Sequence, residues 1–206
     1  MNDMPRPHDL LWGLTPSKLP ADAPAWARQV LAAGQPVVVR RAFVARGQVA
    51  VGVRGASRDQ RFATTMELRR VALRVPPEQL VRRLPTGALP AFRALTLLKP
   101  FLDELSLVWG VTGSVGYQLA CGVTAVRVDS DLDLLLRTPQ PLSRQLAGEL
   151  QQLLDDSPCR VDLQLETPAG GIALREWAGT SRQVLLKCAT GARLIENPWD
   201  PAELAA

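Results

Sequence analysis

Three aspartates in two leucine-rich segments have the types and spacing needed to bind a divalent cation. In "SDLDLLLR", Asp131 and Asp133 are two residues apart, and in "VDLQLE", Asp162 begins a second alternating run. Side chains two residues apart on a strand point to the same face, so Asp131 and Asp133 share a face, and Asp162 shares one with Gln164 and Glu166. If the two strands are neighbours, three carboxylates meet and repel one another. Mg²⁺, which prefers hard oxygen ligands, would relieve that repulsion.

The structural alternative for these acids is a half-exposed strand whose polar face happens to be acidic, because D-x-D pairs are common. Gly113 and Ser114 add a second feature upstream. The pair follows the strand-like "LSLVW" and opens a short helix that Gly122 can end. A strand–Gly-Ser–helix turn presents backbone N–H groups and a hydroxyl at the positive end of a helix dipole, which suits phosphate. Taken alone, Ser114 is equally well explained as an N-cap.

Basic residues must balance any polyphosphate bound near these acids. "VRGASRDQR" places Arg54, Arg58 and Arg61 on a glycine-containing loop after a strand, and guanidinium groups pair with phosphate through two hydrogen bonds. The alternative is an exposed loop of solvated arginines. Lys187, amid apolar residues in "VLLKC", is either a phosphate ligand or an edge residue whose ammonium reaches water.

The elements that must position the acids form an α/β pattern in the second half of the chain. "SDLDLLLR", "CRVDLQLET" and "RQVLLKC" are predicted strands, and a helix is predicted before Pro100. "PLSRQLAGELQQLLDD" is an amphipathic helix whose leucines form one stripe: Leu142, Leu146, Leu150, Leu153 and Leu154. Strand, helix and strand at this spacing predict an α/β core with a mixed sheet (α+β).

A smaller α+β domain is predicted ahead of this core. "APAWARQVLAAG" predicts a helix that ends at Gly34, and "PVVVRRAF" with "QVAVGVRG" predicts a hairpin. Four prolines and a glycine in "VPPEQLVRRLPTGALPAF" mark a domain boundary. We therefore assign residues 1–84 to a basic N-terminal domain and residues 85–206 to the catalytic domain.

Composition excludes several classes of protein. The chain has 206 residues, of which 47% are hydrophobic and 21% charged, as in ordinary globular proteins. No apolar run approaches the roughly 20 residues that span a bilayer, and the first residues do not resemble a signal peptide. Three widely spaced cysteines argue against a disulfide framework, so we expect a reduced, cytoplasmic protein. The single histidine, His8, leaves no basis for a zinc site with paired Cys/His ligands and a poor one for a serine–histidine–acid triad.

The charge divides unevenly along the chain. Residues 1–95 carry 15 Lys and Arg against 6 Asp and Glu, and residues 96–206 carry 9 against 14. A basic half joined to an acidic half indicates that one binds anions and the other holds cations, although solvated arginines are the alternative. Aromatic residues make up only 5% of the chain and do not interleave with the basic runs, which argues against nucleic-acid binding.

The order strand, Gly-Ser, helix, D-x-D strand and later lone Asp resembles the nucleotidyltransferase superfamily, which has a polymerase-β-like fold. The resemblance implies that Gly113 and Ser114 hold a triphosphate. It also implies that Asp131, Asp133 and Asp162 hold two Mg²⁺ ions, with Mn²⁺ as the alternative. The link from Ser114 to Asp131 is somewhat longer than is commonest in that superfamily, and a loop or added strand in "CGVTAVRVDS" would absorb the extra residues.

A closer resemblance covers nearly the whole chain. "RPHDLLWG", "TGSVGYQLACG", "SDLDLLLR", "RVDLQLETPAGGIALREWA" and "RLIENPW" are similar to segments of the phosphoribosyl-dephospho-CoA transferases, the holo-acyl-carrier-protein synthases of malonate decarboxylase. These enzymes move the phosphoribosyl-dephospho-CoA group from its triphosphate precursor to a serine of the acyl-carrier subunit and release pyrophosphate. The resemblance implies that Asp131 and Asp133 are the key acids, and that the carrier and triphosphoribosyl-dephospho-CoA are the partners.

Three other functions stay open from the residues alone. The first is another metal-dependent nucleotidyltransferase that modifies a protein or a small molecule. The second, from a different class, is a non-enzymatic nucleic-acid-binding protein, suggested by the sequence pI of 9.4. The third is a D-x-D glycosyltransferase that uses Mn²⁺ and a sugar nucleotide, against which the Gly-Ser turn argues.

Overall fold

A pair of prolines separates two units of the chain in this computed structural model, which describes residues 4–57 and 59–200. One unit is Met1–Pro76 and the other is Pro77–Ala206. The division lies earlier in the chain than the boundary predicted between residues 84 and 85. The reason is that α2 (Pro77–Leu80) packs in the second unit, where Gly110 lets the strand β6 approach it closely: a Cβ on Gly110 would lie 2.5 Å from the Pro77 side chain.

The first unit is built on a five-stranded sheet in the order β4-β3-β2-β1-β5, in which neighbouring strands are antiparallel. The predicted hairpin is confirmed as β2 and β3. The segment that follows it forms a further strand, β4. The elements of this unit are β1 (Leu10–Trp12), η1 (Pro16–Lys18), α1 (Ala25–Ala32), β2 (Val37–Val39), β3 (Gln48–Arg54), β4 (Arg61–Glu67), η2 (Leu68–Arg70) and β5 (Leu73–Val75).

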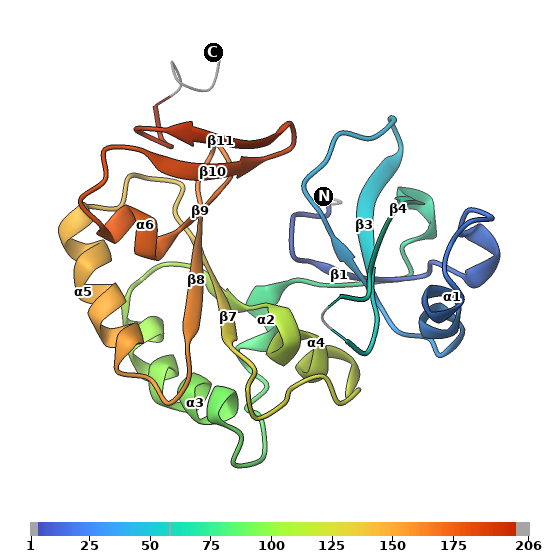
Figure 1. The fold of residues 1–206 in the computed structure, drawn as a ribbon, viewed down its shortest axis with the longest axis horizontal. Coiled ribbons are helices and arrows are strands. Elements are labelled where there is room, and N and C mark those ends of the chain that lie inside the picture. The colour runs from blue at the N-terminus through green and yellow to red at the C-terminus, as the bar shows by residue number, and fades with distance from the viewer. Residues whose placement is uncertain (1–3, 58, 201–206) are drawn as a thin grey trace. The chain divides into compact units, whose positions relative to one another are not determined.

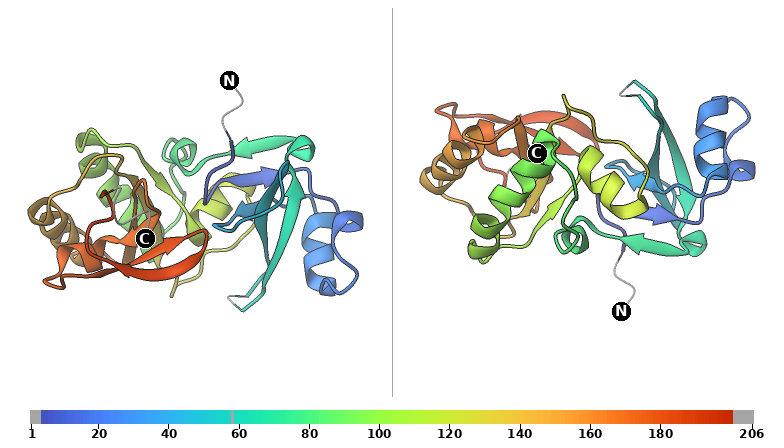
Figure 2. Two further views of the ribbon diagram at one scale, coloured as in Figure 1. Left: turned by 90° about the horizontal axis from the view of Figure 1, so that it is seen from above. Right: turned by 90° about the horizontal axis from the view of Figure 1, so that it is seen from below.

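The core of the first unit forms between α1 and the inner face of its sheet. Both views in Figure 2 show α1 beside the long β3–β4 hairpin. Ala27 and Leu31 of α1 are buried in a cluster that also contains Val51 and Val53 of β3. The predicted end of this helix is confirmed, because Gly34 follows it with φ +71°, a conformation that glycine adopts without strain.

The second unit is built on a six-stranded mixed sheet in the order β11-β10-β9-β8-β7-β6. The β7–β8 pair is parallel, and the other pairs are antiparallel. The predicted strands and helices of this half are present, and β9, α6 and β11 are additional to them. The remaining elements are α3 (Pro90–Glu104), β6 (Trp109–Val111), α4 (Gly113–Cys121), β7 (Leu132–Arg137), α5 (Arg144–Asp155), β8 (Val161–Glu166), β9 (Gly171–Ala173), α6 (Leu174–Ala178), β10 (Val184–Cys188) and β11 (Gly191–Ile195).

Helices cover the apolar face of this sheet. Figure 1 shows α3, α5 and α6 along one side of the β7–β8 pair. The leucine stripe of α5 is largely confirmed: Leu150 and Leu154 are buried, and Ser143 caps the helix by accepting a hydrogen bond from the Leu146 N–H at 3.1 Å. The helix predicted before Pro100 instead runs through it to Glu104, because the buried side chains of α3 continue to Leu102 beyond the proline.

No helix in the described ranges is both long enough and apolar enough to cross a bilayer.

Candidate active site

The parallel register of β7 and β8 brings the two predicted acidic strands together. Asp133 is the direct partner of Asp162, and Leu132 is the partner of Val161. Leu132 and Leu134 are fully buried under the helices, so the residues that alternate with them, including Asp133, turn to the opposite face. The same alternation buries Val161, Leu163 and Leu165 in β8 and leaves Asp162 half-buried on the face of Asp133.

Arg160 completes a four-residue cluster with Asp131, Asp133 and Asp162. The Leu132 N–H donates to the Arg160 carbonyl at 3.0 Å, which continues the ladder and places Arg160 beside Asp131. Neighbouring strands lie about 4.8 Å apart, and alternate residues on a strand lie about 6.6 Å apart. Three carboxylates and one guanidinium therefore occupy the corners of a small patch on one face of the sheet, with a net charge of about −2 when all are ionised.

The guanidinium of Arg160 is bound to one of these acids. Its Nε and one terminal nitrogen donate to Asp162 Oδ1 at 3.0 and 2.9 Å. These hydrogen bonds raise the pKa of Arg160, with further contributions from the charges of Asp162, Asp131 and Asp133. Sequence reasoning missed Arg160, although its position two residues before Asp162 carries the parity that would have placed it on the same face.

The cluster also affects the pKa of a neighbouring thiol, that of Cys159. Burial is the main cause that raises the pKa of Cys159, and the charge of Asp131 raises it further. Cys159 immediately precedes Arg160 in the chain. Its pKa should therefore change when the charge of Asp131 is removed.

The Gly113–Ser114 turn is in direct contact with one of these acids, Asp133. Gly113 is the first residue of α4 and has φ +59°. A Cβ built on Gly113 would lie 1.8 Å from Asp133 Oδ2, so only glycine leaves room for this carboxylate. The Thr112 N–H donates to the Asp133 carbonyl at 2.9 Å, which joins the start of the helix to the strand. Ser114 itself is buried, with 8% of its surface exposed.

The long link between the turn and the acids is an ordered loop, and it contains no added strand. Gln118 of α4 accepts hydrogen bonds through Oε1 from the N–H groups of Ala125 and Val126, at 2.9 and 3.0 Å. The buried Ser130 accepts one from the Arg127 N–H at 2.9 Å. These contacts, together with Gly122 at φ +75° after α4, direct the chain into Asp131.

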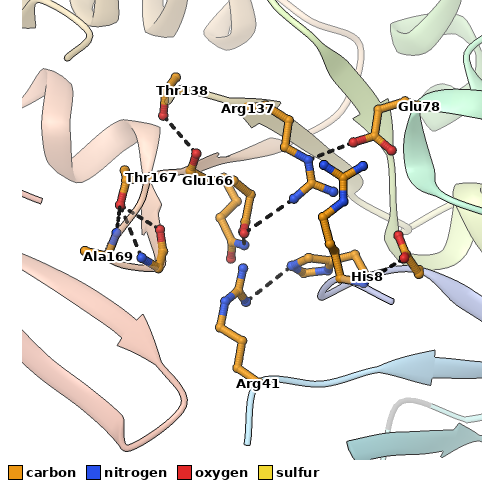
Figure 3. A network of polar contacts seen from close by, with 12 residues as sticks. His8, Arg41, Glu78, Arg137, Thr138, Glu166, Thr167 and Ala169 are labelled. Carbon is orange, nitrogen blue, oxygen red and sulfur yellow. Dashed lines mark hydrogen bonds and ion pairs between the residues drawn. The ribbon is translucent and has the colours of Figure 1, made fainter. Parts of the chain in front are cut away.

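A polar network ties β7 to β8 at the far end of the same face (Figure 3). Arg137, the partner of Glu166 in the parallel ladder, donates to Glu78 Oε1 at 2.7 Å and lies 3.7 Å from Glu166 Oε2. Thr138 donates to the Glu166 carbonyl through its N–H at 2.9 Å and its hydroxyl at 3.2 Å. Because both ends of the β7–β8 pair are fixed, the register that aligns Asp133 with Asp162 is held.

Of the predicted basic residues, only Lys187 lies in the same unit as the acids, and it is not part of the cluster. Lys187 of β10 is exposed and pairs with Gly171, which pairs with Glu166. It therefore shares the face of the acids but lies at the far end of the strands, about 13 Å along them. Arg54 and Arg61 are cross-strand partners at the end of the β3–β4 hairpin in the first unit. Arg58 lies outside the described residues.

The donor set of the cluster fits a hard divalent cation in its chemistry. Its donors are carboxylate oxygens, the kind of hard ligand that Mg²⁺ and Mn²⁺ prefer. In the described part of the chain, however, no three His, Cys, Asp or Glu side chains are gathered closely enough to hold an ion. One of the three acids, Asp162, is hydrogen-bonded to Arg160 instead. Asp131, Asp133 and Asp162 as metal ligands therefore remain a prediction.

The mixed sheet, with a glycine-started helix against an acidic strand, gives the second unit an α+β nucleotidyltransferase-like fold. No solved structure gives a significant match to this chain. Two family models do match it. The model for the C-terminal domain of phosphoribosyl-dephospho-CoA transferase MdcG matches residues 79–198, and the model for its N-terminal domain matches residues 6–77. The chain therefore belongs to the phosphoribosyl-dephospho-CoA transferase family.

Curated relatives extend this assignment over almost the whole length. A phosphoribosyl-dephospho-CoA transferase of Pseudomonas putida strain W619 is 60% identical over 202 residues, which are 98% of each chain. One of Pseudomonas fluorescens strain Pf-5 is 58% identical over 97% of this chain and 96% of its own. One of Pseudomonas aeruginosa strain PAO1 is 52% identical over 98% and 97%.

Proposed function

We propose that this protein transfers the phosphoribosyl-dephospho-CoA group from 2'-(5''-triphosphoribosyl)-3'-dephospho-CoA to a serine of the malonate decarboxylase acyl-carrier subunit, with release of pyrophosphate. The observation that carries the proposal is the 60% identity to a phosphoribosyl-dephospho-CoA transferase over 98% of both chains. The alignment of Asp133 with Asp162 beside the start of α4 supports it, because such a transfer needs acids and a phosphate-binding turn on one face.

The proposed reaction is a displacement at the α-phosphorus of the donor. The serine hydroxyl oxygen of the carrier forms a bond to this phosphorus, and the bond from phosphorus to the oxygen bridging the α and β positions breaks. Pyrophosphate leaves with the electron pair of that bond, and the serine proton passes to a base. We assign the role of proton acceptor to Asp162, which is the direct cross-strand partner of Asp133. Catalysis of this kind is chiefly positioning and charge stabilisation.

The residues of the second unit would divide the work as follows. Bound Mg²⁺ would neutralise the transferring phosphate and the leaving pyrophosphate, with Asp131 and Asp133 as shared ligands and Asp162 as ligand to one ion. The N–H groups at the start of α4 would bind the departing pyrophosphate, since they lie at the positive end of the helix dipole. Gly113 would keep those groups close to Asp133.

The basic first unit is proposed to attract the acceptor. Carrier proteins of this kind are expected to be acidic, and residues 1–76 carry 12 Lys and Arg against 5 Asp and Glu. We also propose that the reaction takes place in the cytoplasm, which agrees with the thiol state of Cys121, Cys159 and Cys188.

Intact mass spectrometry of the carrier subunit tests the proposal. The purified carrier is incubated with this protein, Mg²⁺ and triphosphoribosyl-dephospho-CoA, and should gain the mass of the donor less pyrophosphate on one serine. Excess EDTA should abolish the gain. An unmodified carrier would refute the proposed reaction, and a carrier that instead gains a nucleotide from one of a panel of nucleoside triphosphates would indicate a different nucleotidyltransferase.

A further inference from the structure

Arg160 is a cation surrounded by the three acids that are predicted to bind metal. It is the one cation of the four-residue cluster, and it is hydrogen-bonded to the acid that the proposed function assigns to a metal ion. Its side chain is 58% exposed, and that of Asp162 is 39% exposed. An ion pair this exposed is weak and can exchange its partner without unfolding anything.

A divalent cation and the Arg160 guanidinium cannot both be close neighbours of Asp162 without cost. They carry the same sign of charge, and the strand spacing puts them within about 5–7 Å of each other at this patch. Removing a single positive charge at that distance should favour the cation by roughly three- to tenfold, depending on how far water and salt screen the repulsion. Arg160 and the cation therefore compete for one carboxylate.

The displaced guanidinium would have a specific use. A donor that enters with a metal ion brings phosphate oxygens to the same face of the sheet, and guanidinium binds phosphate through two parallel hydrogen bonds. Arg160 immediately precedes the first residue of β8 and lies beside Asp131. A rotation of its long side chain is therefore enough to break the contact with Asp162 without any movement of the strand.

We propose that Arg160 exchanges its binding partner during the reaction. In the metal-free enzyme it pairs with Asp162 and neutralises its charge. When a divalent cation binds Asp162, the Arg160 side chain turns away and binds the polyphosphate of the donor. Arg160 is thus a positioning residue for both the cation and the donor. This inference rests on the proposed function, because it takes the acids as metal ligands and the donor as a polyphosphate.

Metal binding without substrate tests the first half. Mn²⁺ is titrated into the full-length protein and followed by electron paramagnetic resonance of the free ion. Arg160→Ala should bind Mn²⁺ about three- to tenfold more tightly than the unsubstituted protein, and Arg160→Lys should change the affinity less because it keeps the charge. Arg182→Ala is the matched control, since it removes an equal charge and an exposed ion pair with Glu196 at 3.0 Å elsewhere in the same unit.

Binding of inorganic triphosphate in the presence of Mg²⁺, measured by calorimetry, tests the second half. Arg160→Ala should weaken it by about tenfold or more, and Arg160→Lys should weaken it partly, because a lysine keeps the charge but loses the two-fold hydrogen bond. Arg182→Ala should change neither affinity. Unchanged Mn²⁺ affinity in Arg160→Ala, or unchanged triphosphate affinity, overturns the exchange.

The two proposals can fail separately. If the unsubstituted protein modifies the carrier and binds Mn²⁺ but Arg160→Ala behaves like Arg182→Ala, only the exchange is refuted. If the unsubstituted protein binds no Mn²⁺, or if Asp133→Asn binds it equally well, the metal site of the proposed function is refuted and the exchange with it.

Discussion

Replacing Gly113 with alanine should lower the transfer activity far more than the stability of the fold, because the added methyl group would collide with the Asp133 carboxylate. At φ +59° a residue with a Cβ costs about 1–2 kcal/mol of stability. The Cβ would also lie 1.8 Å from Asp133 Oδ2, well inside any real contact, so this carboxylate must move. A misplacement on the order of 1 Å in a catalytic group can lower the rate about 100-fold.

Gly122→Ala is the matched control for this substitution. Gly122 follows the same helix with φ +75°, and a Cβ there meets no atom within 4 Å. Both variants should lose about 1–2 kcal/mol in chemical denaturation, with any excess in Gly113→Ala due to the contact. Only Gly113→Ala should lose transfer activity, by about 100-fold in kcat/KM for the carrier.

Initial rates against carrier concentration, at fixed donor and Mg²⁺, give the comparison directly. If Gly113→Ala retains activity within a few-fold of Gly122→Ala, then Asp133 either does not need its present position or takes no part in the transfer. If both variants lose activity equally, the loss comes from the strain of the helix ends, and the assignment of the Gly-Ser turn to the reaction is wrong.

Three further outcomes are expected. Asp131→Asn should abolish transfer and leave the melting temperature without metal unchanged or higher, since it removes one of three clustered negative charges; near-normal turnover would contradict the assignment. The same substitution should lower the pKa of Cys159, because burial and then the Asp131 charge raise it, so iodoacetamide labelling of Cys159 at about pH 8, followed by peptide mass spectrometry, should be faster. Raising the ionic strength from about 0.1 to about 1 M shortens the screening length from about 10 to about 3 Å and should lower kcat/KM for the carrier by about tenfold or more, with less change in kcat. Charge reversal at the exposed Arg46 should mimic high salt, and rates indifferent to both would show that the basic unit does not attract the carrier.

Local alternation was enough to predict how the acidic strands present their side chains. The leucines that alternate with Asp133 and Asp162 had to be buried, so each acid had to face away from the core, and β7 and β8 confirm this. The glycine-started helix could be predicted for the same reason, because it depends on neighbours in the chain. So could the ends of α1 and α4, where Gly34 and Gly122 follow the last turn.

Local sequence could not predict contacts that depend on which strands are neighbours and in what register. Asp133 lies beside Asp162 because β7 and β8, which α5 separates in the chain, pair in one particular register. A shift of that register by one residue would have turned one of the two acids toward the core. The same pairing places Arg160 beside Asp131, whereas the parity of Arg160 in the sequence predicts only that it shares the face of Asp162. The division at Pro76 depended likewise on where α2 packs.

The order of residue types along each strand and helix was therefore enough to show which side chains face away from the core, because backbone geometry and burial act within each element. Two contacts could be recognised only in the folded chain: Gly113 leaves room for the Asp133 carboxylate, and Arg160 donates hydrogen bonds to Asp162. The first contact joins residues far apart in the chain, and the second, between residues two positions apart, depends on how the two side chains are oriented, so no periodicity of the sequence records either of them.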